Sequence, residues 1–144
     1  MAIATQTLID GALARLAAAL PELEVALYPA NPASFRLNAP LGAVLLSYPG
    51  STYGPPILMG RVEQQRIPRF GVTLVVRQLW GADGAATLLD RLRDALVGWR
   101  PTDCEPLHIV YDRLLQEDAG LWWYAAEFAA ATRIVLPIIP EVLE

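Results

Sequence analysis

Residue types suited to nucleophilic catalysis or zinc binding are few in this sequence. Cys104 is the single cysteine and His108 the single histidine among 144 residues. A cysteine and a histidine together can form a thiol nucleophile and its base. Residues four apart point the same way only on a helix, whereas Pro101, Pro106 and the β pattern that follows oppose a helix here. We therefore expect both residues to be structural, and no thiolate or imidazole set for zinc is present.

Carboxylates on apolar segments are the next candidates for chemistry. Asp112 and Arg113 lie in one such segment, and Glu127 and Arg133 lie in another. Paired carboxylates can act as general acid and base, but the sequence does not give their separation. Charge pairs within or between subunits are the simpler interpretation of these residues.

The segment from Gly81 to Gly84 lies between an expected strand and an expected helix, where phosphate-binding loops occur. It contains neither the glycine fingerprint of dinucleotide sites nor the lysine of a P-loop. A tight turn with Asp83 capping the helix is therefore expected. Taken together, the sequence predicts a protein that is not an enzyme and has no cofactor and no metal site.

Aromatic and basic residues are the candidates for surfaces that bind macromolecules. The aromatic run 122–124 has strand spacing, which is typical of core and interface anchors. Arg61, Arg66 and Arg69 form the one local basic cluster, predicted either as a solvated surface or as a rim that binds an acidic partner. The formal charge of −4 and the isoelectric point near 4.9 argue against specific nucleic-acid recognition.

Length and hydropathy predict one domain, residues 1–144, with surface left for other subunits. Hydrophobic residues make up 54% of the chain and mean hydropathy is +0.34, which is high for a soluble monomer. The longest apolar stretch, 121–132, contains Glu127 and is too short for a membrane helix. Asp10 and Arg15 interrupt the N-terminal apolar residues, so we expect no secretory signal and a cytosolic, soluble chain.

Periodicity and breakers predict the order of elements. Helices are expected at 5–19 and from the 81–84 turn to about Gly98, and strands at 23–28, 42–48 and 69–80. Segment 49–65 contains many glycines and prolines and is predicted to be a long irregular loop. Segments 107–116 and 121–135 are expected to form a hairpin. The predicted fold class is α+β: an antiparallel or mixed sheet with two helices packed on one face and a long C-terminal β-hairpin.

The second arm of that hairpin is long for so small a protein. At ~3.3 Å per residue it would extend about 50 Å, against a diameter of about 37 Å for a compact chain of this length. One face is almost wholly apolar and should lie under the helices. The other face carries small residues and two charges, and is the predicted subunit interface: Trp123, Ala125, Glu127, Ala129, Ala131 and Arg133.

The element order, with the segment RFGVTLVVRQLWGADGAATLLDRLRDALVGW, resembles the tail-terminator proteins of tailed bacteriophages, above all the Mu-like prophage form of contractile tails. The resemblance extends over nearly the whole chain and rests on pattern and length. It implies a structural subunit, without a cofactor, that forms a hexameric ring on the last ring of tail-tube protein. Such a ring stops tube growth and offers the surface to which the neck or head attaches.

The resemblance also implies a location and partners. The chain would be assembled in the bacterial host cytoplasm into the virion tail, or into a headless tail-like particle, with the tail-tube protein and with sheath and neck proteins as partners. Two alternatives stay open: a head-tail connector of the neck, and a small ligand-binding or hydrolytic domain that uses His108, Asp112 and the long loop. A deep polar pocket lined by these side chains would favour the hydrolytic domain.

Overall fold

The computed structural model describes residues 3–141, so residues 1–2 and 142–144 of the predicted single domain lie outside the described residues. In chain order the elements are α1 (Thr5–Ala19), β1 (Glu24–Leu27), the short 3-10 helix η1 (Pro32–Ser34), β2 (Gly42–Tyr53), β3 (Ile57–Leu58), β4 (Arg61–Val76), α2 (Ala85–Leu96), β5 (His108–Asp118), β6 (Leu121–Ala129) and β7 (Thr132–Pro137).

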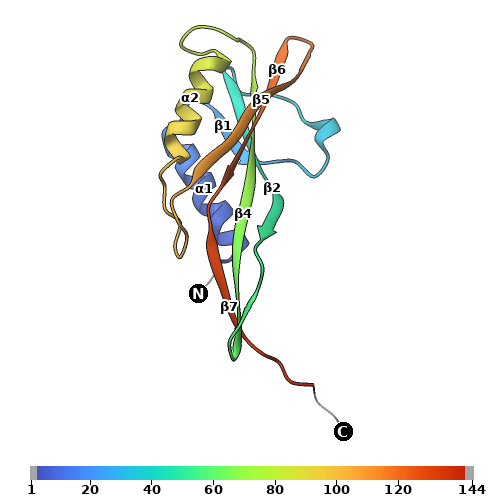
Figure 1. Ribbon diagram of the computed structural model, residues 1–144. Coiled ribbons are helices and arrows are strands. Elements are labelled where there is room, and N and C mark those ends of the chain that lie inside the picture. Colours follow the sequence, from blue (N-terminus) through green and yellow to red (C-terminus); the bar gives the residue numbers. More distant parts are fainter. Residues whose placement is uncertain (1–2, 142–144) are drawn as a thin grey trace.

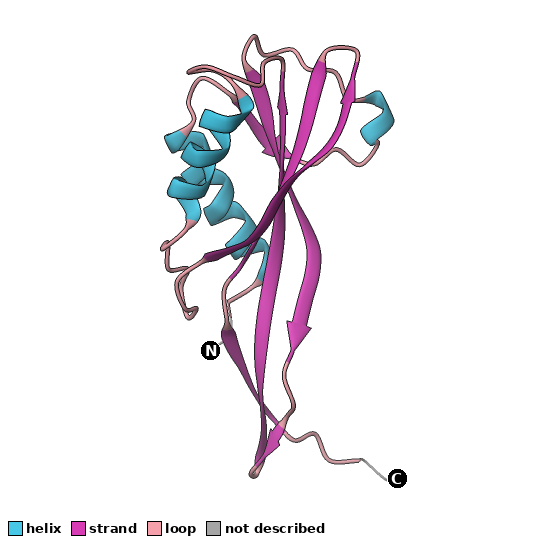
Figure 2. Cartoon of the chain, turned by 45° about the horizontal axis from the view of Figure 1, so that its top comes forward, coloured by secondary structure: helices cyan, strands magenta, loops and turns pink. Residues whose placement is uncertain are grey.

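A mixed sheet of seven strands is the centre of the fold. Its main order is β1-β2-β4-β6-β5, with β3 and β7 also paired to β4. Only the β1 and β2 pair among these is parallel. Both long helices cover the same face of the sheet, and the 28–41 loop with η1 lies on the other side (Figures 1 and 2). The predicted α+β class, with two helices on one face, is confirmed.

The main core lies between the helices and one face of the sheet. Strand β4 contributes Phe70 and Leu74 at alternating positions, α1 contributes Leu16, and α2 contributes Leu92, all fully buried. The period of two in the strand and of three and four in the helices produces this core, because each brings its apolar residues to one side. Phe128 of β6 stacks on Phe70 with ring centroids 5.7 Å apart.

The predicted long hairpin arm is present, and β4 runs beside it for its whole length. The arm is interrupted once, between β6 and β7, and its pairing register with β4 is the same on both sides of the interruption. Arg69 lies opposite Ala129, and Arg66 lies opposite Thr132. Pro68 lies opposite the interruption and has no N–H to donate to the ladder. The Ala130 N–H still donates to the Pro68 carbonyl at 3.4 Å, and the carbonyl of the next residue, Ala131, accepts the Glu105 N–H at 2.8 Å. Strands β6 and β7 are therefore two parts of one path, separated where a proline removes a ladder bond.

The predicted irregular loop at 49–65 is wrong. Most of it is extended: β2 continues to Tyr53, β3 follows, and β4 begins at Arg61 rather than near residue 69. The breakers occupy positions that a ribbon tolerates. Pro49 falls in the register shift between Ser47 and Gly50, and Gly60 has φ 73° in the turn between β3 and β4.

This ribbon projects beyond the helices. We define the distal arm as residues 53–66 together with 132–139; it contains β3, the first part of β4, and β7 (Figure 1). Neither helix covers its tip in either ribbon view (Figures 1 and 2). The length predicted for the hairpin thus appears in the structure as a projection of three paired segments.

The start of α2 also differs from expectation. Gly84 is its N-cap, and no side chain caps it, so Asp83 does not have the predicted role. A Cβ at Gly84 would lie 2.4 Å from the Trp80 carbonyl oxygen, so the turn itself requires glycine here. The turn is held by backbone bonds, such as that from the Ala85 N–H to the Gln78 carbonyl at 2.9 Å.

Candidate interaction surfaces

Arg66 is not at a partner-binding rim, as the sequence predicted, but inside the molecule. Its side chain lies on the helix-facing side of β4 and only 7% of the residue is exposed. The guanidinium donates to the Ile3 carbonyl at 3.1 Å and to Thr5 Oγ1 at 2.6 Å. It also donates to Ser51 Oγ at 3.1 Å and to Tyr48 OH at 3.3 Å. Arg66 therefore joins the start of α1 to β2.

The other two arginines of the predicted rim have acidic partners within the chain. Arg69 Nη1 lies 3.0 Å from Glu127 Oε2, across the β4 and β6 pair. Arg61 Nε donates to Glu63 Oε1 at 2.8 Å. Side chains alternate between the two faces of β4. Arg61 and Arg69 therefore lie on the face away from the helices, and Arg66 lies on the face toward the helices. The three therefore do not form one basic patch.

The hydrogen bonds around Arg66 also act on Tyr48. Burial tends to raise the pKa of its phenol, but hydrogen bonds from Ser51 and Arg66, together with the positive charge of Arg66, outweigh burial. The pKa of Tyr48 is consequently lowered. The arrangement is structural in character, since every group in it is held by another part of the same chain.

The predicted subunit face of β6 is covered in part by the chain itself. Trp123 packs edge to face on Phe35 of the 28–41 loop, with ring centroids 5.7 Å apart and planes at 74°. Behind them a second buried cluster contains Ala43, Leu45 and Val75. The cover that the 28–41 loop provides for this face was not predicted from the sequence.

Among the other predicted interface residues, only Arg133 is exposed. Ala129 is buried, with 1% exposed, which corrects its assignment to an open face. Ala125, Glu127 and Ala131 are half-buried. The charge of Glu127 is paired with Arg69, and that of Arg133 with Glu63 at 3.3 Å. The described residues thus leave little of this face free for a neighbour.

The residues considered for catalysis do not converge. His108 pairs with Ala129 and Asp112 with Ala126, so the two side chains leave opposite faces of β5. Cys104 is buried at an isolated bridge to Thr132, and burial raises the pKa of its thiol, which opposes thiolate formation. A nucleophile with its base is therefore not assembled from these three residues.

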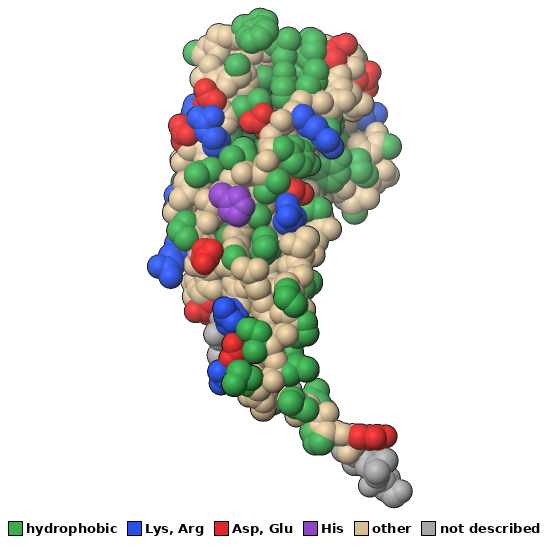
Figure 3. Space-filling model, viewed as in Figure 1, with side chains coloured by type: hydrophobic (Ala, Val, Ile, Leu, Met, Phe, Trp, Pro, Cys, Tyr) green, Lys and Arg blue, Asp and Glu red, His purple; other side chains and the backbone are tan. Residues whose placement is uncertain are grey.

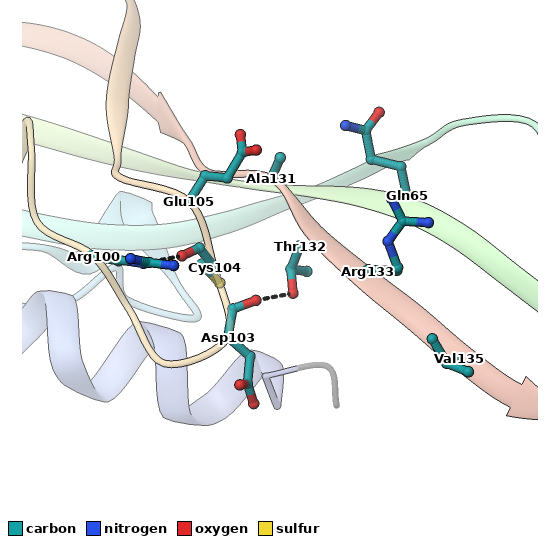
Figure 4. A pocket seen from close by; sticks show the side chains of 9 residues that line it. All are labelled: Gln65, Arg100, Asp103, Cys104, Glu105, Ala131, Thr132, Arg133 and Val135. Atoms are coloured by element: carbon teal, nitrogen blue, oxygen red, sulfur yellow. Dashed lines mark hydrogen bonds between the residues drawn. The ribbon is translucent and has the colours of Figure 1, made fainter.

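A shallow polar hollow of about 340 Å³ lies beside Cys104 (Figure 4). Thr132 Oγ1 donates across it to the Asp103 carbonyl at 2.6 Å, and Arg100 Nε donates to the Cys104 carbonyl at 3.0 Å. These bonds tie the 97–107 connection to β7. Neither His108 nor Asp112 lines the hollow, so it is not the pocket that the hydrolytic alternative requires.

Within residues 3–141, no group of three or more His, Cys, Asp or Glu side chains is placed to hold a metal ion. No helix in that range is both long and apolar enough to cross a membrane.

The distal arm is an apolar feature that the fold leaves open. Hydrophobic side chains are visible over the narrow projecting part of the space-filling view (Figure 3). Met59, at the β3 to β4 turn, is 80% exposed. The other exposed large apolar residues of the arm are Tyr53, Ile57, Leu58, Val135, Leu136, Ile138 and Ile139. Exposed apolar surface of this extent on a projection is typical of a protein interaction site.

Strand β5 is the second open surface. It lies at the end of the main strand order and pairs with β6 alone. Ten of its eleven residues are exposed, with Ile109 half-buried. Val110, Tyr111, Leu114 and Leu115 are its exposed large apolar side chains. A long edge strand with such side chains is a site for pairing with another chain.

An apolar groove adjoins the tip of this edge. It has a volume of about 680 Å³ and lies between the 28–41 loop and the β5 to β6 hairpin. Tyr28, Phe35, Leu115 and Trp123 contribute to its lining. The groove extends the open surface of β5 onto the face away from the helices.

Comparison with known proteins gives one family. The model of the Gp37 protein family matches residues 12–140, which is most of the chain and includes both the distal arm and β5. The chain belongs to the Gp37 protein family. This family is related to phages, so the predicted bacteriophage connection is confirmed at that level. No curated protein matches the chain in sequence.

On the open surfaces of this Gp37 family member, Arg61 and Arg133 of the distal arm are the exposed residues that belong to the predicted rim and interface. Arg66 has the same parity as Phe70 on β4, so a strand extended to residue 61 would have placed it on the core side. Val110 and Leu114 were visible as apolar residues in the first hairpin segment. The prediction placed the subunit interface on one face of the second hairpin segment, whereas the first segment, β5, is the strand at the end of the main sheet order.

Proposed function

We propose that this chain is a tail-terminator protein, the structural subunit of a ring that caps the tail tube of a phage or of a tail-like particle. The ring ends tube polymerisation and provides the surface to which neck or head attaches. The observation that carries the proposal is the projecting apolar arm on a member of a phage-related family. A small chain that exposes such an arm needs a partner to cover it.

The α+β architecture is suited to ring formation. Two separate surfaces, the distal arm and the β5 edge, are open on different parts of the molecule. A contact between unlike surfaces of identical subunits closes into a ring when the rotation it imposes divides the circle. We propose a hexamer, in accord with the resemblance to tail terminators.

The proposed partners are further copies of the chain, the tail-tube protein, and the sheath and neck proteins of the tail. The proposed role is not enzymatic and needs no cofactor. Its site is the virion tail, with assembly in the cytoplasm of the bacterial host. Specific nucleic-acid recognition and membrane insertion are not part of the proposal.

Polymerisation of purified tail-tube protein tests this role. Added before elongation, the chain should shorten the tubes in proportion to its concentration, and electron microscopy should show it at one tube end. Binding to portal or neck components, with tube lengths unchanged, would identify a head-tail connector instead. Unchanged tubes without any end-bound protein would contradict the proposal.

A further inference from the structure

Charge and exposed apolar surface together point to one particular contact between subunits. We propose that the distal arm of one copy docks along the β5 edge of a second copy, head to tail. The inference rests on the proposed ring and names the two surfaces that would build it. It replaces the β6 face as the subunit interface.

The distal arm combines apolar and basic character. Leu58 and Met59 are strongly exposed at its tip. The side chains of Arg61 and Arg133 are each 58% exposed and share a single carboxylate, that of Glu63. Within the arm as defined, the two arginines against one glutamate leave one uncompensated positive charge on its open part, and the exposed Glu141 lies two residues beyond its end.

The β5 edge is apolar and acidic. Its exposed apolar side chains accompany Asp112, Glu117 and Asp118, and Arg113 is its one arginine. Three carboxylates against one guanidinium leave a net charge of −2 with His108 neutral. Arg113 is moreover placed over the Tyr111 ring at 5.0 Å and so lies along its own strand.

These charges select the pairing. Two arms brought together would place positive charge against positive charge, and two β5 edges would place negative against negative. An arm against a β5 edge brings opposite charges together, and like-charge contacts across interfaces are strongly disfavoured. Since the two surfaces differ, the contact is heterologous and each copy retains a free surface for the next.

Backbone geometry allows the same pairing. Strand β7 pairs with β4 along one of its edges. Along its other edge, the pairing among the described residues is the single β-bridge from Thr132 to Cys104. Residues 133–137 therefore present an open edge, as β5 does. Addition of one exposed strand to another supplies main-chain hydrogen bonds, while the side chains provide the specificity.

Charge reversal on each surface tests the contact in solution. One variant carries Arg61→Glu and Arg133→Glu on the arm, and the other carries Asp112→Arg and Glu117→Arg on β5. Native mass spectrometry and sedimentation should show assembly of the unmodified chain. We expect each variant alone to assemble at least about tenfold more weakly, because every arm then meets an edge of its own charge.

An equimolar mixture of the two variants gives the decisive result. An acidic arm then meets a basic edge, and a basic arm meets an acidic edge, so the mixture should assemble again with alternating copies. The control reverses two exposed carboxylates on the helices, Asp10→Arg and Asp94→Arg, and should leave assembly unchanged. Circular dichroism confirms that each variant is folded.

Three results would overturn the contact. The first is assembly that neither charge-reversal variant weakens, which would mean that the ring forms through other surfaces. The second is a mixture that stays dissociated. The third is an unmodified chain that remains monomeric up to about 1 mM, a concentration that detects even weak association. The tube-length experiment is independent of all three, so failure of the contact is distinguishable from failure of the proposed function.

Discussion

Replacement of Arg66 by alanine should destabilise the protein strongly, although arginine is normally a surface residue. The guanidinium bonds the Ile3 carbonyl and the hydroxyls of Thr5, Ser51 and Tyr48, at distances from 2.6 to 3.3 Å. Alanine removes all four bonds and leaves a void between α1 and β2. The acceptors left behind then have to find water in a confined space.

The magnitude follows from the contacts. A hydrogen bond that involves a charged group contributes about 1.5 to 3 kcal/mol, and bonds within one network are not additive. Tyr48 is exposed and Ser51 is half-buried, so their hydroxyls can hydrate. Counting only the bonds to Ile3 and Thr5, we expect the free energy of unfolding to fall by about 3 kcal/mol. For a chain of this size that lowers Tm by about 10 °C.

Thermal and urea unfolding, followed by circular dichroism, measure this change. Arg61→Ala is the matched control, since it makes the same substitution on the same strand where the side chain is 58% exposed and bonded to Glu63. Its effect should stay within about 0.5 kcal/mol. If Arg66→Ala proved as stable as Arg61→Ala, the network around Arg66 would not stabilise the fold and the reasoning would be refuted.

Further predictions concern the core, the thiol and the phenol. Phe128→Ala should lower the free energy of unfolding by about 3 to 5 kcal/mol, whereas Leu58→Ala on the exposed arm should change it little; equal losses in urea unfolding would contradict the burial pattern. Because burial raises the folded-state pKa of Cys104, its contribution to stability is present below the unfolded-state pKa and is lost as pH rises through the folded-state value. Cys104 should accordingly react with a disulfide reagent only on unfolding, and rapid labelling of the native protein would count against its burial. Because the folded-state pKa of Tyr48 is lowered, its contribution is present above the unfolded-state pKa and is lost as pH falls through the folded-state value. Phenolate absorbance should show an early ionisation that Tyr48→Phe removes and that Arg66→Ala shifts to higher pH.

The helices and the central core could be predicted because their signal is periodic. Leu16 and Leu92 follow helical spacing, and Phe70 and Leu74 alternate on a strand, so the buried faces followed from local pattern alone. The α1 bounds, Thr5–Ala19, agree with the range expected from the sequence. The predicted and observed elements agree here because burial of one apolar face is what stabilises each element.

The arm could not be predicted in the same way, because its breakers were read as a loop. Pro49 and Gly60 each occupy a position where a ribbon accepts an irregular residue, and only the partner strands reveal those positions. Likewise, Arg66 is buried because the start of α1 lies over the part of β4 that contains it. Burial of Ala129 and the cover over Trp123 arise from contacts between segments far apart in the chain.

Membership in the Gp37 family connects these features to phages, and the open arm and edge are the surfaces on which the proposed assembly rests. Arg66 and the interior network around it fix the base of the arm to α1. A firmly anchored base lets an exposed ribbon present its apolar residues in a defined direction. Hydrogen bonds at the base and exposure at the tip together suit the proposed docking of the arm on another subunit.

Tail length in particles assembled without this chain tests the central claim most directly. Electron microscopy of such particles should show tubes that are overlong or irregular in length, and supply of the chain in trans should restore a uniform length. Normal tubes of uniform length in its absence would contradict its proposed role as the terminator.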